Sequence, residues 1–269
     1  MTFPLDKKLL RKKLASMQTA DKIRFHTMLA ALLEPRPSSI IVDLGCGHGN
    51  TIKYMLPKIG NRGKIYGVDN DPALLGITEH LYRDALKTNK LELVQSDLEH
   101  HLPFSDSSVD RLVSHNVLEC IGDKVTFINE CYRILRKGGI LVMSHTDWDS
   151  QIYNSSSNDL TRKLVHLYAD SAQSWMKNSD GTLGRKLNGI FARTRFKKHY
   201  GAEVHLTVDY DFSRTSYAYR MALDIMGVAR DRGLAEKDLQ AWYKDLRLKN
   251  RKHEFYYANL TNIVIARKP

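Results

Sequence analysis

Residues 41–50 read IVDLGCGHGN, an apolar run that enters a turn with three glycines spaced two residues apart. Glycine adopts positive φ without strain, so Gly45, Gly47 and Gly49 allow a sharp turn and a close approach of the backbone to a ligand. A loop of this kind after a buried strand is typical of sites that hold an adenosine-containing ligand. The chemistry of the neighbouring side chains indicates which ligand that is.

Three adenosine ligands are candidates: a dinucleotide, a nucleoside triphosphate and S-adenosylmethionine. The dinucleotide fingerprint G-x-G-x-x-G would need a glycine where this chain has Asn50. A P-loop is excluded, because GCGHGNT lacks the G-K-[ST] ending and its phosphate-binding lysine. Asp43 lies two residues before the first glycine, where a carboxylate would repel a pyrophosphate. It suits a ligand with a positive amino group or sulfonium, which favours S-adenosylmethionine.

The segment VDLGCGHG resembles motif I of the class I S-adenosylmethionine-dependent methyltransferases. Further markers follow in order, in YGVDND and in VQSDLEHHLPFSDSSVD. The phrases LPFSDSSVDRLVSHNVLECI and ECYRILRKGGILVMS resemble the ubiquinone/menaquinone-biosynthesis-type branch (methyltransferase type 11), which methylates small molecules. The resemblance covers roughly residues 39–145 and implies the cofactor S-adenosylmethionine.

The resemblance also implies which residues bind the cofactor. Asp69 would accept hydrogen bonds from both ribose hydroxyls, a charge-assisted pairing. Asp97 would read the adenine amino group, although it is also suited to cap a turn. Carried over residue by residue, the cofactor-binding set is Asp43, Gly45, Cys46, Gly47, Gly49, Asp69, Asn70, Asp97, Leu98 and Asn116.

The acceptor side is expected where the fourth and fifth strands end. Methyl transfer is an in-line displacement, and a general base is needed only if the acceptor must lose a proton. His115 is the first candidate base, and His145 with Asp147 is a second candidate, a base with its orienting carboxylate; Asp147 alone would also suit a cationic amine. Trp148 and Tyr153 would supply an aromatic wall for the substrate. A hydrogen bond to the backbone or shaping of the pocket is the alternative role for His115, and packing is the alternative role for the other four residues. Glu119 is placed either to face the substrate or to cap the next helix, and capping is expected.

The pattern of the chain predicts a Rossmann-like α/β fold: a seven-stranded, mostly parallel, doubly wound sheet with N-terminal helices and an inserted helical lid. A helical cap is expected over residues 1–38, ending at EPRP, and the methyltransferase domain over 39–269, with helical insertions at about 146–183 and 213–253. The expected strands are 39–44, 63–69, 91–97, 109–115, 137–145, 202–212 and 254–268. The expected helices are 5–34, 50–59, 71–87, 124–136, 160–176, 185–199, 214–231 and 235–250, with a polar loop over 146–159.

Composition restricts the setting of the protein. Among 269 residues there are three cysteines, too few for a disulfide framework, and no uncharged apolar run approaches the roughly 18 residues of a membrane span. The N-terminus lacks the apolar core of a secretion signal. We therefore expect a cytoplasmic protein without a membrane span, and the sequence indicates no oligomeric state.

The excess of 41 Lys and Arg over 30 Asp and Glu leaves an RNA-modifying methyltransferase as an alternative. The [DNS]-P-P-[YFW] motif of exocyclic-nitrogen enzymes is absent, since SHNV stands in its place, and no zinc ribbon appears. Nucleic acid is therefore not the expected partner, and no bound metal is expected. The sequence favours a small-molecule acceptor methylated on nitrogen or oxygen. A non-catalytic interaction module is the third alternative.

Overall fold

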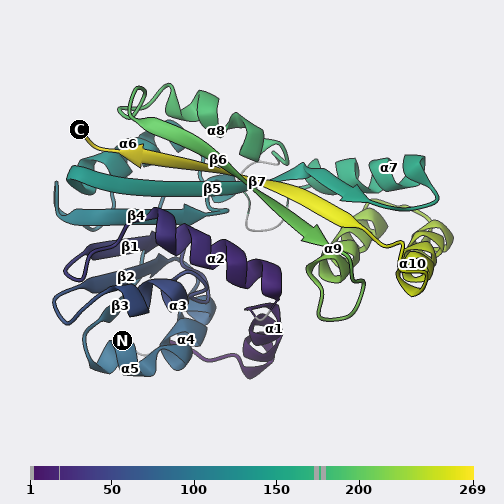
Figure 1. The fold of residues 1–269 in the computed structure, drawn as a ribbon, viewed down its shortest axis with the longest axis horizontal. Coiled ribbons are helices and arrows are strands. Elements are labelled where there is room, and N and C mark those ends of the chain that lie inside the picture. Colours follow the sequence, from purple (N-terminus) through teal and green to yellow (C-terminus); the bar gives the residue numbers. More distant parts are fainter. Residues whose placement is uncertain (1–2, 18, 173–175, 177–179) are drawn as a thin grey trace.

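A computed structural model describes residues 3–17, 19–172, 176 and 180–269. Its centre is a seven-stranded sheet with the strand order β3-β2-β1-β4-β5-β7-β6 (Figure 1). The strands are β1 (Ile40–Leu44), β2 (Lys64–Asp69), β3 (Leu91–Gln95), β4 (Val109–His115), β5 (Leu135–Tyr153), β6 (Tyr200–Asp209) and β7 (Tyr257–Arg267).

The first five strands form the parallel part of the sheet. β1 lies between β2 and β4, and each neighbouring pair from β3 to β5 is parallel. The chain therefore crosses to one side of β1 and then to the other. The strand order reverses between β1 and β4, and in open α/β sheets this switch point is where ligands bind.

The last two strands make the sheet mixed, and the prediction of a mostly parallel sheet is wrong. β7 lies between β5 and β6 and runs antiparallel to both. Alternation of apolar residues identifies a strand but carries no information on its direction. The direction of β7 follows from its starting point, because the chain enters it at the outer end of the sheet, directly after α10 (Glu236–Arg251).

Helices cover both faces of the sheet. One core, with Leu112, Phe127 and Leu187, lies under α6 (Lys124–Ile134) and α8 (Leu183–Phe191). The other, with Leu29 and Ile52, lies under the remaining inner helices. Those helices are α2 (Ala20–Leu32), α3 (Ile52–Met55), the 3-10 turn η1 (Leu56–Lys58), α4 (Pro72–Leu81) and α5 (Arg83–Lys87).

The helix bounds predicted from the sequence agree with the structure at the start of α4 but differ for the first two helices and for α8. Asp71 caps α4 as its side chain accepts from the Ala73 amide at 2.8 Å, with Pro72 at the first helical position. The single run expected over 5–34 divides instead into α1 (Lys7–Met17) and α2. The helix expected over 185–199 ends at Phe191, followed by turns.

The polar loop expected from Thr146 is wrong, because β5 continues for 19 residues to Tyr153. Antiparallel pairing with β7 carries the strand on, with Thr146 opposite Thr261 and Tyr153 opposite Tyr257, across an irregularity between Asp147 and Ile152. The helix expected over 160–176 is α7 (Asn158–Ala169); residues 173–175, including Trp175, lie outside the described residues.

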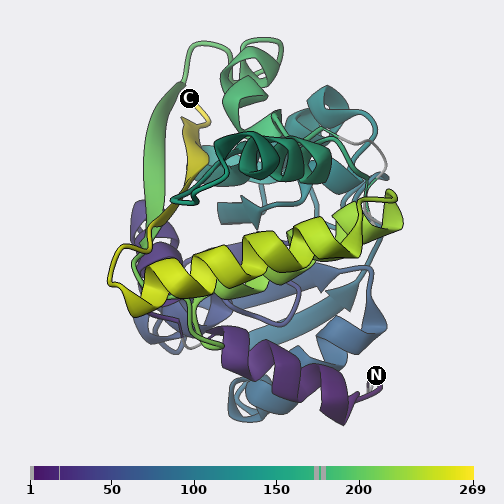
Figure 2. The same ribbon diagram turned by 90° about the vertical axis from the view of Figure 1, so that its right-hand side faces the viewer.

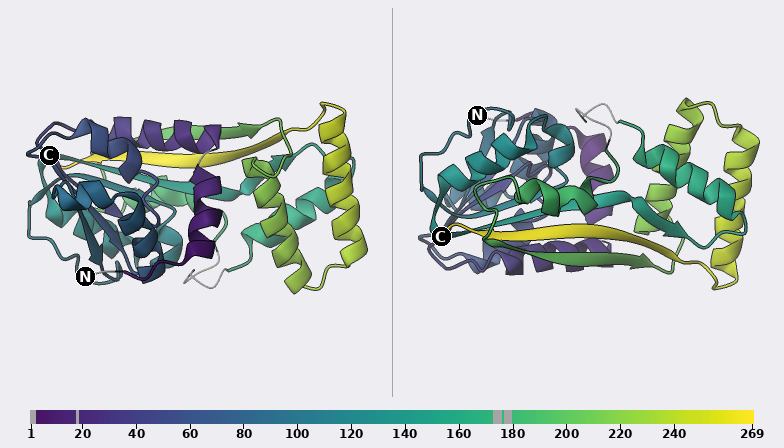
Figure 3. Two further views of the ribbon diagram at one scale, coloured as in Figure 1. Left: turned by 90° about the horizontal axis from the view of Figure 1, so that it is seen from below. Right: turned by 90° about the horizontal axis from the view of Figure 1, so that it is seen from above.

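A distal lobe surrounds the outer ends of β5 and β7. It consists of α7, α9 (Tyr217–Asp231) and α10, and it projects beyond the parallel strands (Figures 1 and 3). Viewed from that end, α10 crosses in front of the sheet between α7 and α1 (Figure 2). The lobe has its own core with Tyr153, Trp242 and Tyr257. No helix within the described ranges has both the length and the apolar character that a membrane crossing requires.

Candidate functional site

The glycine loop joins β1 to α3 at the switch point. Gly45, Gly47 and Gly49 have φ of +72°, +53° and +79°, in the left-handed region that favours glycine. A Cβ on Gly45 would lie 2.2 Å from Val117 Cγ2, and one on Gly49 would lie 2.5 Å from Tyr82 Cε2. A Cβ on Gly47 would meet nothing within 4 Å. Packing therefore requires Gly45 and Gly49, whereas Gly47 borders open space into which a ligand can approach the backbone.

Asp69, the last residue of β2, fixes the conformation of this loop. Its carboxylate accepts hydrogen bonds from the Gly47 amide at 2.8 Å and the Asp71 amide at 3.0 Å. Two amide donors occupy only part of the acceptor capacity of a carboxylate, so capacity remains for ligand hydroxyls. Burial raises the pKa of Asp69 above its ordinary value.

Asp43 lies on β1 beside the loop and is 4% exposed. Its Oδ2 atom is buried without a hydrogen-bond partner among the described residues. Burial, reinforced by the neighbouring Asp69, raises the pKa of Asp43 to about 8. A buried carboxylate oxygen without a partner is costly in a folded protein, and a cationic group of a ligand would satisfy it. This donor set fits the amino group or sulfonium of S-adenosylmethionine.

The other cofactor candidates follow the neighbouring strands at the same edge. Asn70 and Asp97 are exposed after β2 and β3, and Leu98 is buried. Asp97 also caps its own turn, since it accepts from the Glu99 amide at 3.0 Å. Cys46 is buried, and burial raises the pKa of its thiol well above the ordinary value. Its side chain is therefore a neutral packing group.

Asn116 follows β4 with a φ of +55°. Its Oδ1 accepts from the Thr146 amide at 2.8 Å, and its Nδ2 donates to Thr146 Oγ1 at 3.3 Å. The side chain thus ties the end of β4 to β5. In this arrangement the polar atoms of the Asn116 side chain form hydrogen bonds between β4 and β5 at the edge of the site.

His115 ends β4 beneath the N-terminal helices. Its Nδ1 lies 3.0 Å from Ser144 Oγ, and its ring centroid lies 4.7 Å from that of Phe25 and 5.8 Å from that of His26. His26 in turn contacts Thr51 Oγ1 at 3.0 Å, so α2 is anchored over the glycine loop. Burial lowers the pKa of His115 well below its ordinary value. The imidazole is neutral at physiological pH and offers hydrogen bonding rather than charge.

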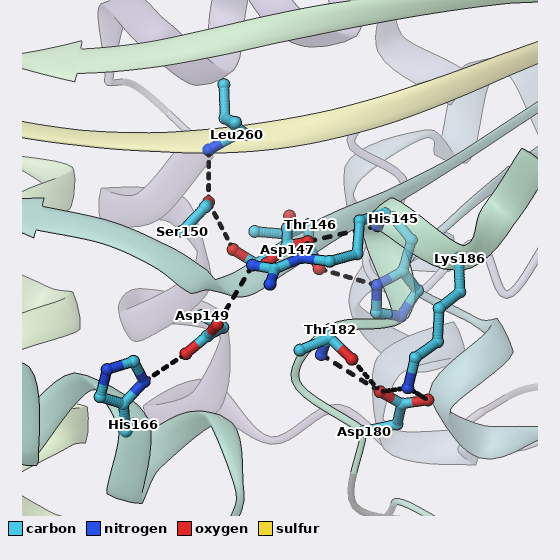
Figure 4. Close-up of polar contacts among 11 residues, drawn as sticks. His145, Thr146, Asp147, Asp149, Ser150, His166, Asp180, Thr182, Lys186 and Leu260 are labelled. Atoms are coloured by element: carbon cyan, nitrogen blue, oxygen red, sulfur yellow. Dashed lines mark hydrogen bonds and ion pairs between the residues drawn. The ribbon is translucent and has the colours of Figure 1, made fainter.

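His145 and Asp147 were expected to follow the fifth strand, but both lie inside it. His145 is fully buried, with Nδ1 2.8 Å from Thr146 O. Both oxygens of Asp147 accept from Arg185, Nε and Nη2 each at 2.6 Å (Figure 4). The expected pairing of His145 with Asp147 is therefore replaced by an ion pair from β5 to α8, which no local spacing reveals.

Glu119 was expected to cap a helix, but Asp123 caps α6 instead, accepting from the Thr126 amide at 3.0 Å. Glu119 is 7% exposed, its Oε2 accepts from Trp148 Nε1 at 3.2 Å and it lies 3.5 Å from His145 Nε2. Capping, the role expected for Glu119, is therefore wrong, and its bond to Trp148 was not predicted because that tryptophan lies 29 residues away.

A second missed group centres on Asp149, which binds His166 on α7 and, at 3.2 Å, Arg185 Nη2 (Figure 4). Nothing in the local sequence marks Asp149, since its partners come from two different helices.

The two expected substrate aromatics both belong to the apolar core of the distal lobe, Tyr153 as a buried member and Trp148 packed against it. Trp148 packs edge-on against Tyr168 at a centroid distance of 6.0 Å, near Glu119. Tyr153 is 4% exposed, contacts Trp242 and Tyr257, and its hydroxyl donates to Ala218 O at 3.3 Å. His145 and Tyr153 lie opposite Asn262 and Tyr257, five residues apart on β7, and a strand rises about 3.4 Å per residue, so Tyr153 lies roughly 17 Å beyond His145. Tyr153 belongs to the core of the distal lobe, in agreement with packing, the alternative role given for it.

Comparison with known proteins agrees with this geometry. Residues 42–143 match the family described as Methyltransferase domain. The chain is 28% identical over 175 residues to an uncharacterized 37.1 kDa protein in transposon TN4556 of Streptomyces fradiae, covering 65% of this chain and 48% of that protein. It is 27% identical over 194 residues to the ubiquinone/menaquinone biosynthesis C-methyltransferase UbiE of Xanthomonas axonopodis pv. citri (strain 306), covering 67% and 76%. The chain thus spans about half the length of the Streptomyces relative.

Solved structures share the fold. The YcgJ protein from Bacillus subtilis matches with a TM-score of 0.58 at 14% identity, over 91% of this chain and 98% of that one. A geranyl diphosphate methyltransferase in complex with S-adenosylmethionine matches with a TM-score of 0.53 at 15% identity, over 97% and 91%.

The fold is a Rossmann-like sheet, and residues 42–143 of it are similar to the methyltransferase domain. More specifically, the chain is similar to the class I S-adenosylmethionine-dependent methyltransferases of the type 11 group, whose cofactor is S-adenosylmethionine.

Proposed function

We propose that this protein methylates a small organic molecule on a nitrogen or oxygen atom. The observation that carries the proposal is the buried Oδ2 of Asp43, which has no hydrogen-bond partner in the described part of the chain, beside the open space at Gly47. Relatives named for ubiquinone and menaquinone biosynthesis, and a fold neighbour named geranyl diphosphate methyltransferase, support a small-molecule acceptor.

On the cofactor side, Asp43 would hold the positive amino group and Asp69 the ribose hydroxyls. Asn70, Asp97 and Leu98 would surround the adenosine at the ends of β2 and β3. When bound, S-adenosylmethionine supplies a methyl group already activated by the sulfonium. The chain then contributes mainly alignment and exclusion of water, which can supply much of the rate enhancement.

On the acceptor side, neutral His115 would hydrogen-bond the acceptor at the end of β4. Glu119, held by Trp148 and 3.5 Å from Nε2 of the buried His145, would orient a polar acceptor group. Asp147, bound at both oxygens by Arg185, would act as a positioning residue. The distal lobe would serve as the lid over the acceptor, with the helices before residue 39 as the cap over the cofactor.

Calorimetric titration with S-adenosylmethionine and S-adenosylhomocysteine, with NAD as the negative control, is the first test. We expect micromolar binding of the first two and none of NAD; binding of NAD alone would overturn the proposal. A screen of amines, phenols, carboxylates and RNA with methyl-labelled cofactor then identifies the acceptor. Transfer to RNA alone would reject a small-molecule acceptor.

Carbon methylation is the second candidate, because several relatives are named C-methyltransferases. The two are distinguished on the product with ¹³C-methyl cofactor. The carbon chemical shift of the transferred methyl group separates attachment to oxygen or nitrogen from attachment to carbon.

A further inference from the structure

The strand β6 lies at one end of the sheet, and its outer edge is unpaired. Among the described residues β6 pairs with β7 alone, continuously over all ten residues of Tyr200–Asp209. Figure 2 shows it along one margin of the molecule. Natural edge strands are protected from further pairing by lysine, proline or a bulge. β6 contains neither lysine nor proline, and its register with β7 has no shift, so this edge is open to another strand.

The backbone groups of alternate residues of β6 point to this open edge. The Arg267 amide at the end of β7 donates to the His199 oxygen, just before β6, at 2.8 Å. In an antiparallel ladder, successive residues direct their backbone groups to opposite sides. Odd-numbered residues of β6 therefore face β7, and the N–H and C=O groups of Ala202, Val204 and Leu206 face outward. A row of unpaired backbone groups is a template for a further strand.

An exposed apolar surface accompanies this edge. Val204 is 58% exposed and Leu206 is 51% exposed, and their side chains share one face of the sheet because they are two residues apart. Leu260 lies directly opposite Leu206 on β7 and is 38% exposed, so it extends the same surface across the next strand. Contiguous exposed apolar side chains of this kind mark interaction sites. We call Val204, Leu206 and Leu260 the β6 edge surface.

The charged groups of β6 favour one register for pairing with a second copy. Glu203 and His205 lie on the face opposite Val204, and the Glu203 side chain is exposed. In a two-fold antiparallel pair centred on Val204, each Glu203 would lie opposite His205 of the other copy. Each Leu206 would then lie opposite Ala202. A pair centred on Glu203 would instead place two carboxylates opposite each other, which is destabilising.

His205 can accept this additional contact. Its Nε2 lies 3.3 Å from Asp21 Oδ1 on α2, and Asp21 also accepts from Thr207 Oγ1 at 2.9 Å. These contacts hold α2 on the inner face of β6. The Nδ1 of His205 forms no hydrogen bond with any described residue, so one ring nitrogen is available to a glutamate of another chain.

We propose that two copies of this chain form a symmetric dimer in which their β6 strands pair antiparallel, centred on Val204. Each sheet then continues into the other, and the two β6 edge surfaces become one apolar surface. The backbone hydrogen bonds supply affinity, and the opposed side chains supply the register. A second copy fits this edge because a two-fold interface requires self-complementarity, and the Glu203–His205 pairing occurs twice in it. The inference is independent of the proposed function.

Sedimentation velocity of the full chain, from micromolar to submillimolar concentration, tests the dimer. The main variant is Val204→Lys, which places two lysines opposite each other at the two-fold axis. Leu206→Lys tests the same surface if Val204→Lys fails to fold, and Glu203→Lys tests the register. The matched control is Leu223→Lys on α9, where the leucine is 44% exposed. Far-UV circular dichroism and thermal melting verify that each variant is folded.

We expect the sedimenting mass of the wild type to rise with concentration from one chain to two. Val204→Lys should weaken dimerisation about tenfold or more, because like charges directly opposite each other are destabilising. Glu203→Lys should weaken it by a similar factor, since both symmetry-related pairs with His205 are lost. Leu223→Lys should dimerise as the wild type does.

A wild type that remains monomeric at every concentration overturns the inference, and so does a dimer that Val204→Lys leaves unchanged. Equal weakening by Val204→Lys and Leu223→Lys also overturns it, because the association would then be a non-specific apolar contact. Full dimerisation of Glu203→Lys overturns the register, since a pair centred on Glu203 would set lysine against lysine in place of carboxylate against carboxylate.

Discussion

Substitution of the first two loop glycines by alanine should separate packing from ligand binding. At Gly45 the new methyl group would lie 2.2 Å from Val117 Cγ2, at a φ of +72°. At Gly47 it would meet no atom within 4 Å, at a φ of +53°. The first change should therefore destabilise the fold, and the second should mainly obstruct the cofactor.

The magnitudes follow from these contacts. A left-handed conformation costs alanine about 1–2 kcal/mol, and this applies to both variants. Overlap in a packed interior adds about 1–3 kcal/mol for Gly45→Ala alone. Its total of about 2–5 kcal/mol corresponds to a melting temperature roughly 5–15 °C lower, against a few degrees for Gly47→Ala. Val117→Ala removes the overlapping atom, which leaves Val117 Cβ at 3.4 Å, so the double variant should recover the overlap term.

Calorimetric melting and titration with S-adenosylhomocysteine measure both quantities on each variant. We expect Gly47→Ala to remain folded with at least about tenfold weaker cofactor binding, a loss comparable to one charged hydrogen bond. Full affinity in Gly47→Ala would refute the assignment of the open space to the cofactor. Equal destabilisation of the two variants, or no recovery with Val117→Ala, would refute the packing argument.

Three further predictions concern the charged groups of the site. Since the folded pKa of Asp43, about 8, lies above its ordinary 3.8, the folded state retains a proton that the unfolded chain releases. The free energy of unfolding of the cofactor-free protein should thus fall as pH rises from about 4 to 8, and Asp43→Asn should flatten this slope in denaturant titrations at several pH values. Cofactor binding at pH 7 should release a proton, seen as a dependence of the calorimetric heat on buffer ionisation; a buffer-independent heat would contradict the role of Asp43. Asp69→Asn should weaken S-adenosylhomocysteine binding about tenfold or more while the protein remains folded, and unchanged affinity would remove Asp69 from the cofactor site. Arg185→Gln should lower the free energy of unfolding by about 1–3 kcal/mol, because buried Asp147 then loses its two charged hydrogen bonds. The double variant with Asp147→Asn should be less destabilised than the sum of the single changes, and strict additivity would show that the pair is not coupled.

Much of the parallel half was predictable from the sequence. β4 matches its expected range, and the Asp71 cap and Pro72 define the start of α4 as expected. These features depend on neighbouring residues alone, through backbone conformation and alternation. The second half was predicted less well, because Thr146 to Tyr153 are polar enough to suggest a loop. Their extended conformation depends on pairing with β7, more than a hundred residues later.

The acceptor side shows the same limit. The carboxylates and glycines proposed to bind the cofactor lie at or next to strand ends, and topology alone brings strand ends together. The partners of Asp147 and Glu119 come instead from 38 and 29 residues away, and no periodicity connects them. The partner of a buried polar group is whichever group the packed interior places within hydrogen-bond distance, and that depends on the tertiary structure.

The sequence by itself determined the glycine turn, the acidic residues beside it and the alternation of strands and helices, because each depends on local backbone chemistry. The tertiary structure decided the direction of β7, the ion pair that occupies Asp147 and the bond of Trp148 to Glu119. These depend on contacts between segments far apart in the chain, and they exist only once packing has removed water from between those segments.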